Sequence, residues 1–348
     1  MKVTFLAAFA VCISLLFGGT AMASTGALYT QTNAQTGNAV HRLDRGPDGS
    51  LTPVATYRTG GTGTGASLQS QGAVALSDDG GVLLAVDAGS NDIAAFHVTR
   101  HGHLTLVDRL PSGGASPVSV DIADGTAYVL NRDGATPNIA TFDVDRSGRL
   151  RPRATTPLAP GALGAAQVSV APDGRSVVVS ERVANRLETF PLRFGRLGAP
   201  TVTASAGAVP FGFAFAPRSG DLVVSEAGTS TVSSYRNGRV STASLAVGQG
   251  AACWVAIDAQ GRFAYTGNAT GSISGFAINR DGTLSALNTD GLTATSPRPN
   301  DLAFAGGYLY AINSFTGTIT AYQQRFDGSL QPLPGADLGT TLAGLAGR

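Results

Sequence analysis

The chain has 348 residues, of which 14% are charged and 46 are glycine, and its formal net charge is +1. With so little net charge, the chain is not expected to bind nucleic acid or anionic membranes through a basic surface. Its length is sufficient for one large hydrophobic core or two ordinary ones.

The N-terminal segment (1–23) is typical of a secretory signal peptide. A lysine follows the initiating methionine, an apolar run covers residues 3–17, and small residues at 21–23 offer a cleavage site before Ser24. The run is short for a bilayer span, so we expect a secreted or periplasmic protein with no membrane span after the signal is removed. Cleavage leaves Cys253 as the one cysteine, which excludes a disulfide within the mature chain and a zinc site built from cysteine pairs.

The rest of the chain repeats one unit, and we expect residues 24–348 to form a single domain. The first turn of the unit closes on Gly80, Gly125, Gly174, Gly220, Gly261 and Gly307, at intervals of 45, 49, 46, 41 and 46 residues. A later turn closes on Gly49, Gly102, Gly148, Gly195, Gly238, Gly282 and Gly328. Turns of this kind favour antiparallel hairpins, because Gly, Asn and Asp tolerate positive φ angles.

Four strands of about 45 residues in total are typical of a propeller blade, which buries its two faces only against its neighbours. The third strand of most units ends in an aromatic residue, at Phe96, Phe142, Phe190, Tyr235, Phe276 and Tyr322. A degenerate first copy of this strand covers residues 40–43.

The number of units predicts a closed ring. Seven later turns are present, but only six first strands precede them, because the mature chain starts at a second strand over residues 27–29. The C-terminal residues 342–346 can supply the missing strand, and their pairing with the N-terminal blade would remove two exposed strand edges. We therefore predict an all-β, seven-bladed propeller with four-stranded antiparallel blades. An open solenoid and a pair of β-sandwiches are the alternatives.

In a propeller the first strand of each blade lines the central channel. The loops after the second strands share one face with the linkers between blades, and we call it the linker face. The opposite face carries the glycine turns, and we call it the turn face. Ligands need varied side chains, so we expect the functional site on the linker face.

Two sets of residues are expected at this face. The ends of the second strands supply Asn33, Asp87, Asn131, Glu181, Glu226, Asn268 and Asn313. The entries of the first strands supply Gln71, Ser116, Gln167, Phe211, Trp254, Asn300 and Asp301. Asn and Asp after a strand also serve to satisfy the backbone groups of a loop, which is the structural alternative for the first set.

The candidate catalytic residues are Glu181, Arg182 and Glu226, because a carboxylate at a channel mouth is costly unless it is paired or used. The candidate substrate-binding residues are Gln71, Arg132, Gln167, Phe211, Trp254, Asn268, Arg298, Asn300, Asp301 and Asn313. Phe211 and Trp254 could form an apolar floor for a ring-shaped ligand or simply plug the channel.

The histidines do not suit a catalytic triad or a metal site. His41 and His97 are predicted on third strands, and His101 and His103 in a turn on the opposite face. Cys253 is at a strand entry, but no imidazole is placed to activate its thiol. We predict no cofactor and no metal.

Several segments resemble the seven-bladed lactonase family, which includes bacterial propeller 6-phosphogluconolactonases and fungal carboxymuconate cyclases. The resemblance is carried by residues 170–175 and 273–276, with 279–284 after them, and it extends over residues 26 to 346. It is strongest to the exported branch of that family. It implies a propeller fold and activity on a lactone or a related cyclic compound.

The chain departs from the pattern of that family where cations are expected. The family's Gly-Pro-Arg-His strand entry corresponds here to residues 209–212, so Phe211 and Gly212 replace the Arg-His pair. A Pro-His entry corresponds to residues 166–167, an Asn-Arg pair corresponds to 267–268, and the family's glutamate is retained as Glu226. Loss of these cations implies an uncharged lactone rather than a phosphorylated one.

Two functions remain open at this point. In the first, an exported hydrolase or cyclase uses Glu226 as general acid or base, while Glu181 and Arg182 orient the substrate. In the second, a non-catalytic propeller binds a sugar, a peptide or a surface partner through its linker face. We expect a monomer in either case.

Overall fold

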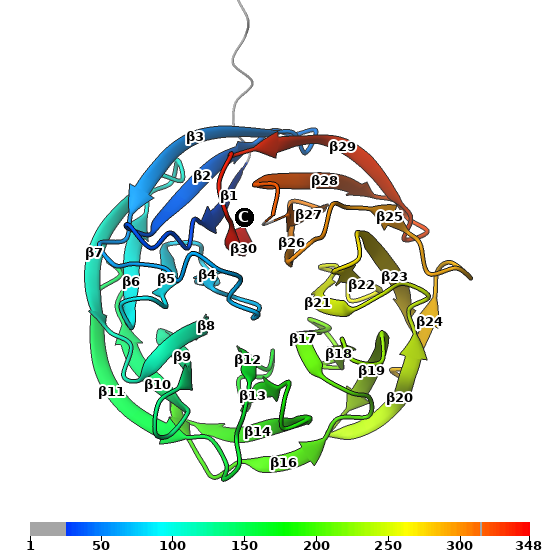
Figure 1. Cartoon of the computed structure of the whole chain (residues 1–348), viewed down its shortest axis with the longest axis horizontal. Helices are drawn as coiled ribbons and strands as arrows, with labels where there is room; N and C mark the ends of the chain where they lie inside the picture. The colour runs from blue at the N-terminus through cyan, green and yellow to red at the C-terminus, as the bar shows by residue number, and fades with distance from the viewer. Residues whose placement is uncertain (1–25, 314) are drawn as a thin grey trace, which may run out of the picture.

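The computed structural model describes residues 26–313 and 315–348, and these form thirty β-strands arranged in a ring (Figure 1). The expected signal peptide lies outside the described residues. No helix of the described residues has the length and hydrophobicity needed to cross a membrane.

The strands form seven antiparallel sheets, which we number as blades in chain order. Blade 1 contains β1 (Gly26–Gln31), β2 (Ala39–Arg45), β3 (Leu51–Arg58) and β30 (Ala343–Gly347). Blade 2 contains β4 (Val74–Leu76), β5 (Val82–Asp87), β6 (Asp92–Val98) and β7 (Leu104–Pro111). Blade 3 contains β8 (Ala115–Ala123), β9 (Thr126–Asp133), β10 (Asn138–Val144) and β11 (Leu150–Pro157).

Blades 4 and 6 have an interrupted outer strand, so each counts five strands. Blade 4 contains β12 (Ala165–Val170), β13 (Ser176–Glu181), β14 (Arg186–Arg193), β15 (Arg196–Leu197) and β16 (Thr201–Ala204). Blade 5 contains β17 (Pro210–Phe215), β18 (Leu222–Glu226), β19 (Thr231–Arg236) and β20 (Arg239–Ala246). Blade 6 contains β21 (Ala252–Ile257), β22 (Phe263–Asn268), β23 (Ser272–Ile278), β24 (Leu284–Ala286) and β25 (Ala294–Thr295). Blade 7 contains β26 (Asp301–Ala305), β27 (Tyr308–Asn313), β28 (Thr318–Gln324) and β29 (Leu330–Asp337).

The C-terminal strand closes the ring, which confirms the predicted seven-bladed propeller. β30 pairs antiparallel with β1, so that Ala346 is opposite Tyr29 and Leu345 is opposite Thr30. β30 thus becomes the innermost strand of a blade whose other three strands come from the N-terminal end. No open edge is left between the first and the last blade.

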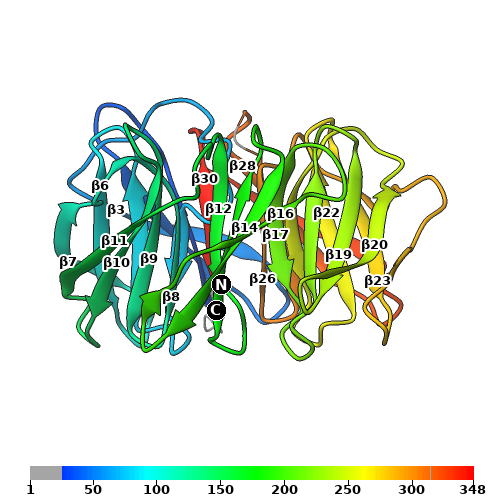
Figure 2. The same ribbon diagram turned by 90° about the horizontal axis from the view of Figure 1, so that it is seen from below.

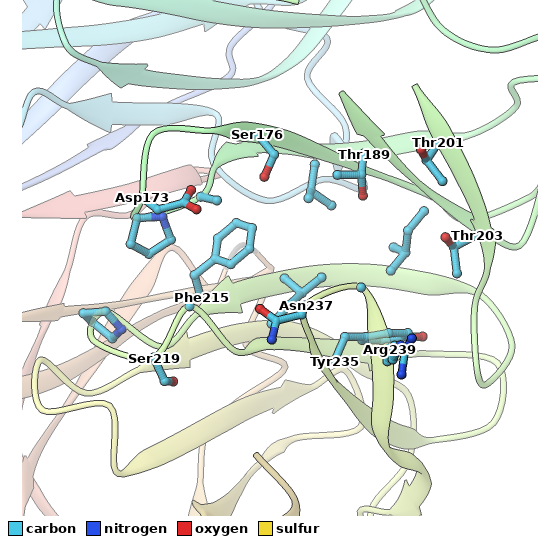
Figure 3. A pocket seen from close by; sticks show the side chains of 18 of the residues that line it. Asp173, Ser176, Thr189, Thr201, Thr203, Phe215, Ser219, Tyr235, Asn237 and Arg239 are labelled. Carbon is cyan, nitrogen blue, oxygen red and sulfur yellow. The ribbon is translucent and has the colours of Figure 1, made fainter. Parts of the chain in front are cut away.

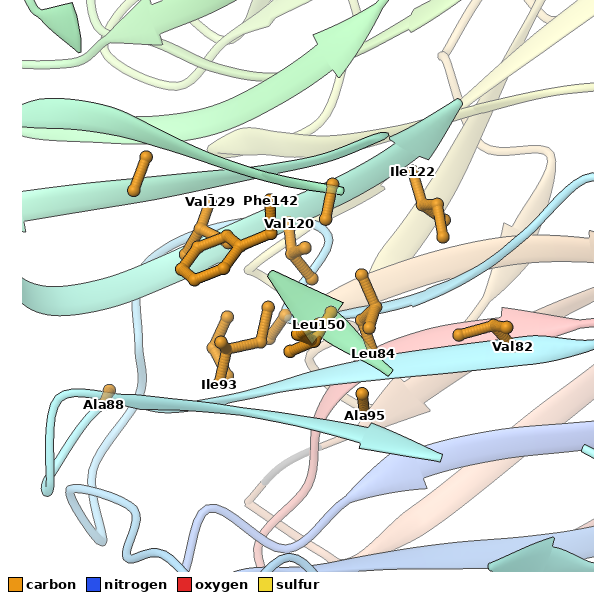
Figure 4. Close-up of a cluster of buried hydrophobic side chains, with 14 of the residues drawn as sticks. Val82, Leu84, Ala88, Ile93, Ala95, Val120, Ile122, Val129, Phe142 and Leu150 are labelled. Carbon is orange, nitrogen blue, oxygen red and sulfur yellow. The ribbon is translucent and has the colours of Figure 1, made fainter. Parts of the chain in front are cut away.

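The core lies between the blades, because both faces of each sheet are covered by a neighbour. In β5, Val82 and Leu84 face blade 3 and pack with Val120 and Phe142 (Figure 4). Leu83 on the same strand belongs to the cluster shared with blade 1. Successive side chains of a strand point to opposite faces of the sheet. Because both faces are covered by neighbouring blades, the middle strands consist of consecutive apolar residues and show no apolar–polar alternation.

Tyrosines on the second strands join neighbouring blades near the turn face. The hydroxyls of Tyr29, Tyr265 and Tyr310 donate to the carbonyls of the turn glycines Gly102, Gly328 and Gly49 in the next blade, at 2.7 to 2.8 Å. At the Gly49 turn, a β-carbon would overlap the ring of Tyr308, and φ is +82°. Only glycine allows this contact without strain.

The connection from β3 to β4 enters the ring axis, where it is buried between blades. Residues 68–72, which we call the axial segment, contact first strands around the channel (Figure 1). Gln71 donates from Nε2 to the Val255 carbonyl at 2.8 Å, and its Oε1 accepts from the Val255 N–H at 3.0 Å. The carbonyl of Gly72 accepts from Val120. The segment closes the channel near the linker face, and edge-on the loops gather at the two faces (Figure 2).

Ring closure should dominate stability. Leu345 is 6% exposed within the cluster that blades 7 and 1 share, whereas Phe194 is 96% exposed on the surface. We expect Leu345→Ala to lower the free energy of unfolding by about 2–4 kcal/mol, because it leaves a cavity at the closing strand. The control Phe194→Ala should change it by about 0.5 kcal/mol or less.

Chemical denaturation of both variants measures the difference. Deletion of residues 342–348 should abolish cooperative unfolding altogether. A truncated protein that melts like the full-length chain would show that the ring does not depend on β30.

Candidate functional site

The residues at the ends of the second strands are buried and bind the linkers beside them. Asp87, Asn131, Glu181, Glu226, Asn268 and Asn313 have no exposed surface. Asp87 accepts from the hydroxyl of Thr59 at 2.7 Å, and Asn131 accepts from that of Ser112 at 2.7 Å. These partners lie in the linkers that arrive from the preceding blade. This arrangement corresponds to the structural alternative, in which the polar side chains satisfy loop groups.

Glu226 has four hydrogen-bond donors around its carboxylate. Oε1 accepts from the Gly207 N–H at 2.6 Å and from the Ser205 hydroxyl at 2.9 Å. Oε2 accepts from the hydroxyls of Thr231 and Ser233 at 2.8 and 2.9 Å. Four donors compensate the lost hydration of a buried carboxylate and leave no oxygen directed at the channel. The geometry therefore favours a structural role for Glu226, and its role as an acid or base stays a prediction.

Glu181 belongs to a buried cluster with Arg186 and Glu188. Arg186 donates from Nε to Glu181 at 2.8 Å and from Nη2 to Glu188 at 2.9 Å. The second oxygen of Glu181 accepts from the Leu163 N–H at 2.8 Å. Burial raises the pKa of Glu188, and a hydrogen bond shared with the Glu181 carboxyl raises it further. Because the single positive charge of Arg186 faces two carboxyl groups, Glu181 and Glu188 can hold one proton between them.

Two glutamines at the entries of first strands use their side-chain amides to pair with the backbone of another first strand, as a neighbouring strand would. Gln167 donates to the Phe213 carbonyl at 2.9 Å and accepts from the Phe213 N–H at 2.7 Å. Gln71 makes the same pair of bonds to Val255, across the channel. Both side-chain amides are occupied by backbone groups, so these predicted substrate-binding residues position the first strands.

Four of the predicted residues meet at the linker face around the axial segment. Arg182 donates from Nη1 to Gln69 Oε1 at 2.8 Å, and its guanidinium carbon lies 5.2 Å from the centre of the Phe211 ring. Phe211 packs edge-on against Trp254, with ring centres 5.4 Å apart. Arg132 donates to the Leu68 carbonyl at 2.7 Å. Arg132, Arg182, Phe211, Trp254 and Gln69 form what we call the channel mouth.

Trp254 contacts both Phe211 and the axial segment. Its indole N–H donates to the Ser70 carbonyl at 3.0 Å, and the residue is 6% exposed. The indole thereby fixes the axial segment, while the ring of Phe211 lies between it and Arg182. This arrangement is compatible with both predicted roles of the aromatic pair, as an apolar floor for a ligand and as a plug of the channel.

The two arginines of the channel mouth are poorly neutralised. Burial lowers the pKa of Arg182, and the positive charge of Arg132 lowers it further. Nε of Arg182 is buried without a hydrogen-bond partner among the described residues. Among the described residues, the one carboxylate within 4 Å of Arg132 is that of Asp133, at 3.9 Å, and it is 61% exposed. An oxygen-bearing ligand group with negative charge would satisfy both guanidinium groups.

The remaining predicted residues lie elsewhere. The guanidinium of Arg298 covers the ring of Phe315 at 4.5 Å, and Asn268 donates to Ser272 and Ser274 in the next strand. Asn313 accepts from Ser296 at 2.9 Å. The backbone N–H of Asn300 donates to the Ile312 carbonyl.

Asp301 lies in the channel beyond the axial segment, beside a cavity of about 300 Å³. Its Oδ2 accepts from the Gly72 N–H at 3.3 Å, and its Oδ1 accepts from the Leu302 N–H at 2.8 Å. Burial raises the pKa of Asp301 to about 7. Asp301 binds the axial segment through Gly72 and does not contact the side chains of the channel mouth.

Cys253 and the histidines lie where the sequence placed them. Burial raises the pKa of the Cys253 thiol to about 12, so the thiol stays protonated at neutral pH and is no nucleophile. His41 lies on β2 and His97 on β6. Across residues 26–313 and 315–348, no three His, Cys, Asp or Glu side chains come together in a way that could hold a metal ion.

The sequence did not reveal the part played by the axial segment. Leu68 and Gln69 supply the groups that position Arg132 and Arg182, yet they follow a glycine-rich stretch typical of a linker. The available signal was weak: Leu68 is a single large apolar residue in a polar loop, and it is 5% exposed.

A family model for "Lactonase, 7-bladed beta-propeller" matches residues 34–163, 148–239 and 230–336. The chain belongs to this lactonase propeller family. The resemblance drawn from the sequence is thereby confirmed, while membership of an exported branch stays a prediction. No curated protein matches this lactonase propeller.

Solved structures share the fold at low sequence identity. A Bacteroides uniformis protein assigned as a 6-phosphogluconolactonase has a TM-score of 0.76 and 17% identity, with 93% of this chain and 99% of that chain covered. The Pseudomonas aeruginosa periplasmic gluconolactonase PpgL has a TM-score of 0.71 and 18% identity, with 92% and 99% covered. Apo AztD from Citrobacter koseri has a TM-score of 0.61 and 12% identity, with 93% and 97% covered. At these identities the likeness shows the fold alone.

The burial of Glu226 predicts a stability effect. In Glu226→Gln an amide nitrogen must replace one acceptor oxygen, and the Gly207 N–H cannot reverse its direction. We expect the free energy of unfolding to fall by about 1–3 kcal/mol, as measured by denaturant titration. Asp143→Asn, at a 57% exposed carboxylate, is the control and should change it by about 0.5 kcal/mol or less. Equal stability of Glu226→Gln and the wild type would contradict a structural role.

The Glu181–Arg186–Glu188 cluster predicts a pH dependence. The raised pKa of Glu188 means that the folded chain keeps a proton that the unfolded chain releases near pH 4.5. Its contribution to stability is therefore complete below that pH and is lost as the pH rises through the raised pKa. In Glu188→Gln the amide donates to Glu181 at every pH, so this loss should disappear.

Unfolding free energies of wild type and Glu188→Gln, measured at about pH 5 and pH 8, give the comparison. The wild type should lose more stability between the two pH values than the variant does. The same loss in both proteins would rule out the shared proton.

Proposed function

We propose that the channel mouth binds a neutral lactone-type small molecule and promotes its hydrolysis. The observation that carries the proposal is the pair of weakly neutralised guanidinium groups of Arg182 and Arg132, with Nε of Arg182 lacking a partner among the described residues and the group lying above the ring of Phe211. Membership of the lactonase propeller family supports the reaction class.

The chemistry follows from the donors in the mouth. Attack of water on a lactone carbonyl develops negative charge on the carbonyl oxygen, and ring opening leaves a carboxylate. Arg182 and Arg132 present fixed N–H donors that bind both of these oxygens more strongly than the neutral carbonyl. Phe211, which is 6% exposed and packs against Trp254, gives the two arginines an apolar base. These side chains orient the substrate and stabilise charge.

A second function has a specific observation in its favour. Glu181 and Glu226, the carboxylates expected to act as acid or base, are fully buried and hydrogen-bonded to the scaffold. A mouth without a free base suits a propeller that binds a sugar acid, a peptide or a surface partner without turnover. Both functions use the same two arginines.

We also propose that the protein works outside the cytoplasm, in the periplasm or as a secreted protein. The basis is the signal-like composition of residues 1–23. One protein of similar fold, PpgL, is described as periplasmic. An exported lactonase propeller would meet free lactones rather than phosphorylated metabolites.

Removal of the Arg182 guanidinium should separate these possibilities. We expect the wild type to hydrolyse at least one of a panel of neutral γ- and δ-lactones, including glucono-δ-lactone, faster than buffer in a pH-stat assay. Arg182→Ala should lower kcat/KM by about 10- to 100-fold, because hydrogen bonds to a charged group contribute about 1.5–3 kcal/mol. Arg151→Ala, an exposed change on β11, is the matched control and should leave the rate unchanged.

No hydrolysis above buffer across the panel would overturn the hydrolase proposal. Calorimetric binding of gluconate that Arg182→Ala weakens would then assign the mouth to binding alone. Equal rates and equal affinities in Arg182→Ala and the wild type would remove the mouth from either function.

A further inference from the structure

A cavity of about 770 Å³ lies between blades 4 and 5, on the turn face and hence opposite the channel mouth. It opens between β13, β14 and β16 on one side and β17, β18 and β19 on the other (Figure 3). Its volume is in the range of small-molecule sites. None of the channel-mouth residues lines it.

The cavity lies where blade 4 carries a valine, at a repeat position that holds tyrosine in blades 3, 6 and 7 and aliphatic residues in blades 2 and 5. Val178 lies three residues before the strand end at Glu181, as Tyr310 lies three residues before Asn313. Tyr310 fills the space to the next blade and binds its turn glycine. Val178 has neither ring nor hydroxyl, and a β-carbon added at the facing turn glycine, Gly238, would meet no atom within 4 Å.

One wall of the cavity is rich in hydroxyl groups. Thr189 of β14 is opposite Thr201 of β16, and Thr203 is the next residue on the same face. Ser176, the first residue of β13, adds a hydroxyl, and Asn237 adds an amide from the turn between β19 and β20. The side chains of these five residues make no hydrogen bond to any other residue of the part of the chain described by the structure. They point into the cavity, where a ligand can reach them (Figure 3).

The other wall is aromatic and aliphatic. Phe215 projects into the centre of the cavity and is held edge-on by Phe213, with ring centres 5.9 Å apart (Figure 3). Leu222 of the same blade extends this apolar surface, and Val178 and Leu187 of blade 4 add apolar side chains beside the hydroxyl groups. A flat ring surface opposite a row of hydroxyls is suited to a molecule with one C–H face and several hydroxyls at its edge.

The charged residues at the rim of the cavity do not favour an ionic ligand. Arg218 donates to the Gln260 carbonyl of the next blade at 3.2 Å, Arg239 lies at the exposed end, and Asp173 supplies the opposite charge. None of these groups is buried. The uncharged donors and acceptors therefore outnumber the charged groups in the interior of the cavity.

We propose that this cavity is a binding site for a neutral carbohydrate of one or two sugar rings. One sugar ring packs its C–H face on Phe215, and its hydroxyls exchange hydrogen bonds with Thr189, Thr201, Thr203 and Asn237. A purely apolar ligand would leave these side chains without water and without partners. The site does not depend on the function proposed for the channel mouth.

The structure offers a matched pair of variants for the test. Val178→Tyr introduces the side chain that blades 3, 6 and 7 carry at this position, fills the cavity, and should keep or raise the melting temperature. Val178→Ala leaves the cavity open. Binding is measured by saturation-transfer NMR and calorimetry with a panel of neutral monosaccharides and disaccharides, including glucose, galactose, mannose, maltose and cellobiose.

We expect at least one sugar to bind the wild type, Val178→Ala and the mouth variant Arg182→Ala with similar affinity, and to bind Val178→Tyr at least tenfold more weakly. Should Val178→Tyr fail to fold, the double variant Thr201→Val/Thr203→Val, at partly exposed positions, should show the same loss. No binding of any sugar to the wild type overturns the proposal. Binding that survives in Val178→Tyr or in the double variant overturns it as well.

Discussion

The structure of the linker face depends on the axial segment, residues 68–72, which crosses the channel and binds first strands on opposite sides of the ring. Gln71 pairs with the backbone of Val255, Ser70 accepts from Trp254, and Gly72 accepts from Val120. A buried loop is acceptable only when its backbone groups find partners, and here the channel wall supplies them. The closure by β30 keeps that wall complete, so ring closure and axial segment together position the channel mouth.

The polar residues of the propeller divide into two groups with different consequences. Those at the ends of the second strands are buried, bonded to the linkers and therefore part of the scaffold, as Glu226 with its four donors illustrates. Arg132 and Arg182 follow such residues by one position and turn towards the axis instead. They carry positive charge without adequate neutralisation, which is an unfavourable arrangement unless a ligand relieves it. For this reason the arginines, rather than the glutamates, define the candidate site.

The sequence predicted the ring well and the site in part. Turn glycines at even spacing and aromatic third-strand ends are local signals, so the blades and the closing role of residues 342–346 could be derived from them. The contact between Gln71 and Val255 joins residues 184 positions apart and has no local signal. The sequence also does not reveal whether a polar residue at a strand end turns to the linker or to the channel, so Glu181 and Arg182 cannot be told apart by sequence alone. The cavity beside Val178 depends on how blades 4 and 5 pack against each other, and no local sequence signal marks it.

Hydrogen–deuterium exchange of the amides of residues 68–72 measures whether this connection is part of the packed channel. We predict that the Gln71 and Gly72 amides exchange as slowly as those of the first strands, since both are bonded inside the ring. Exchange as fast as in an exposed loop, such as the turn at Gly238, would contradict it, and the channel mouth would then lack the support that positions its arginines.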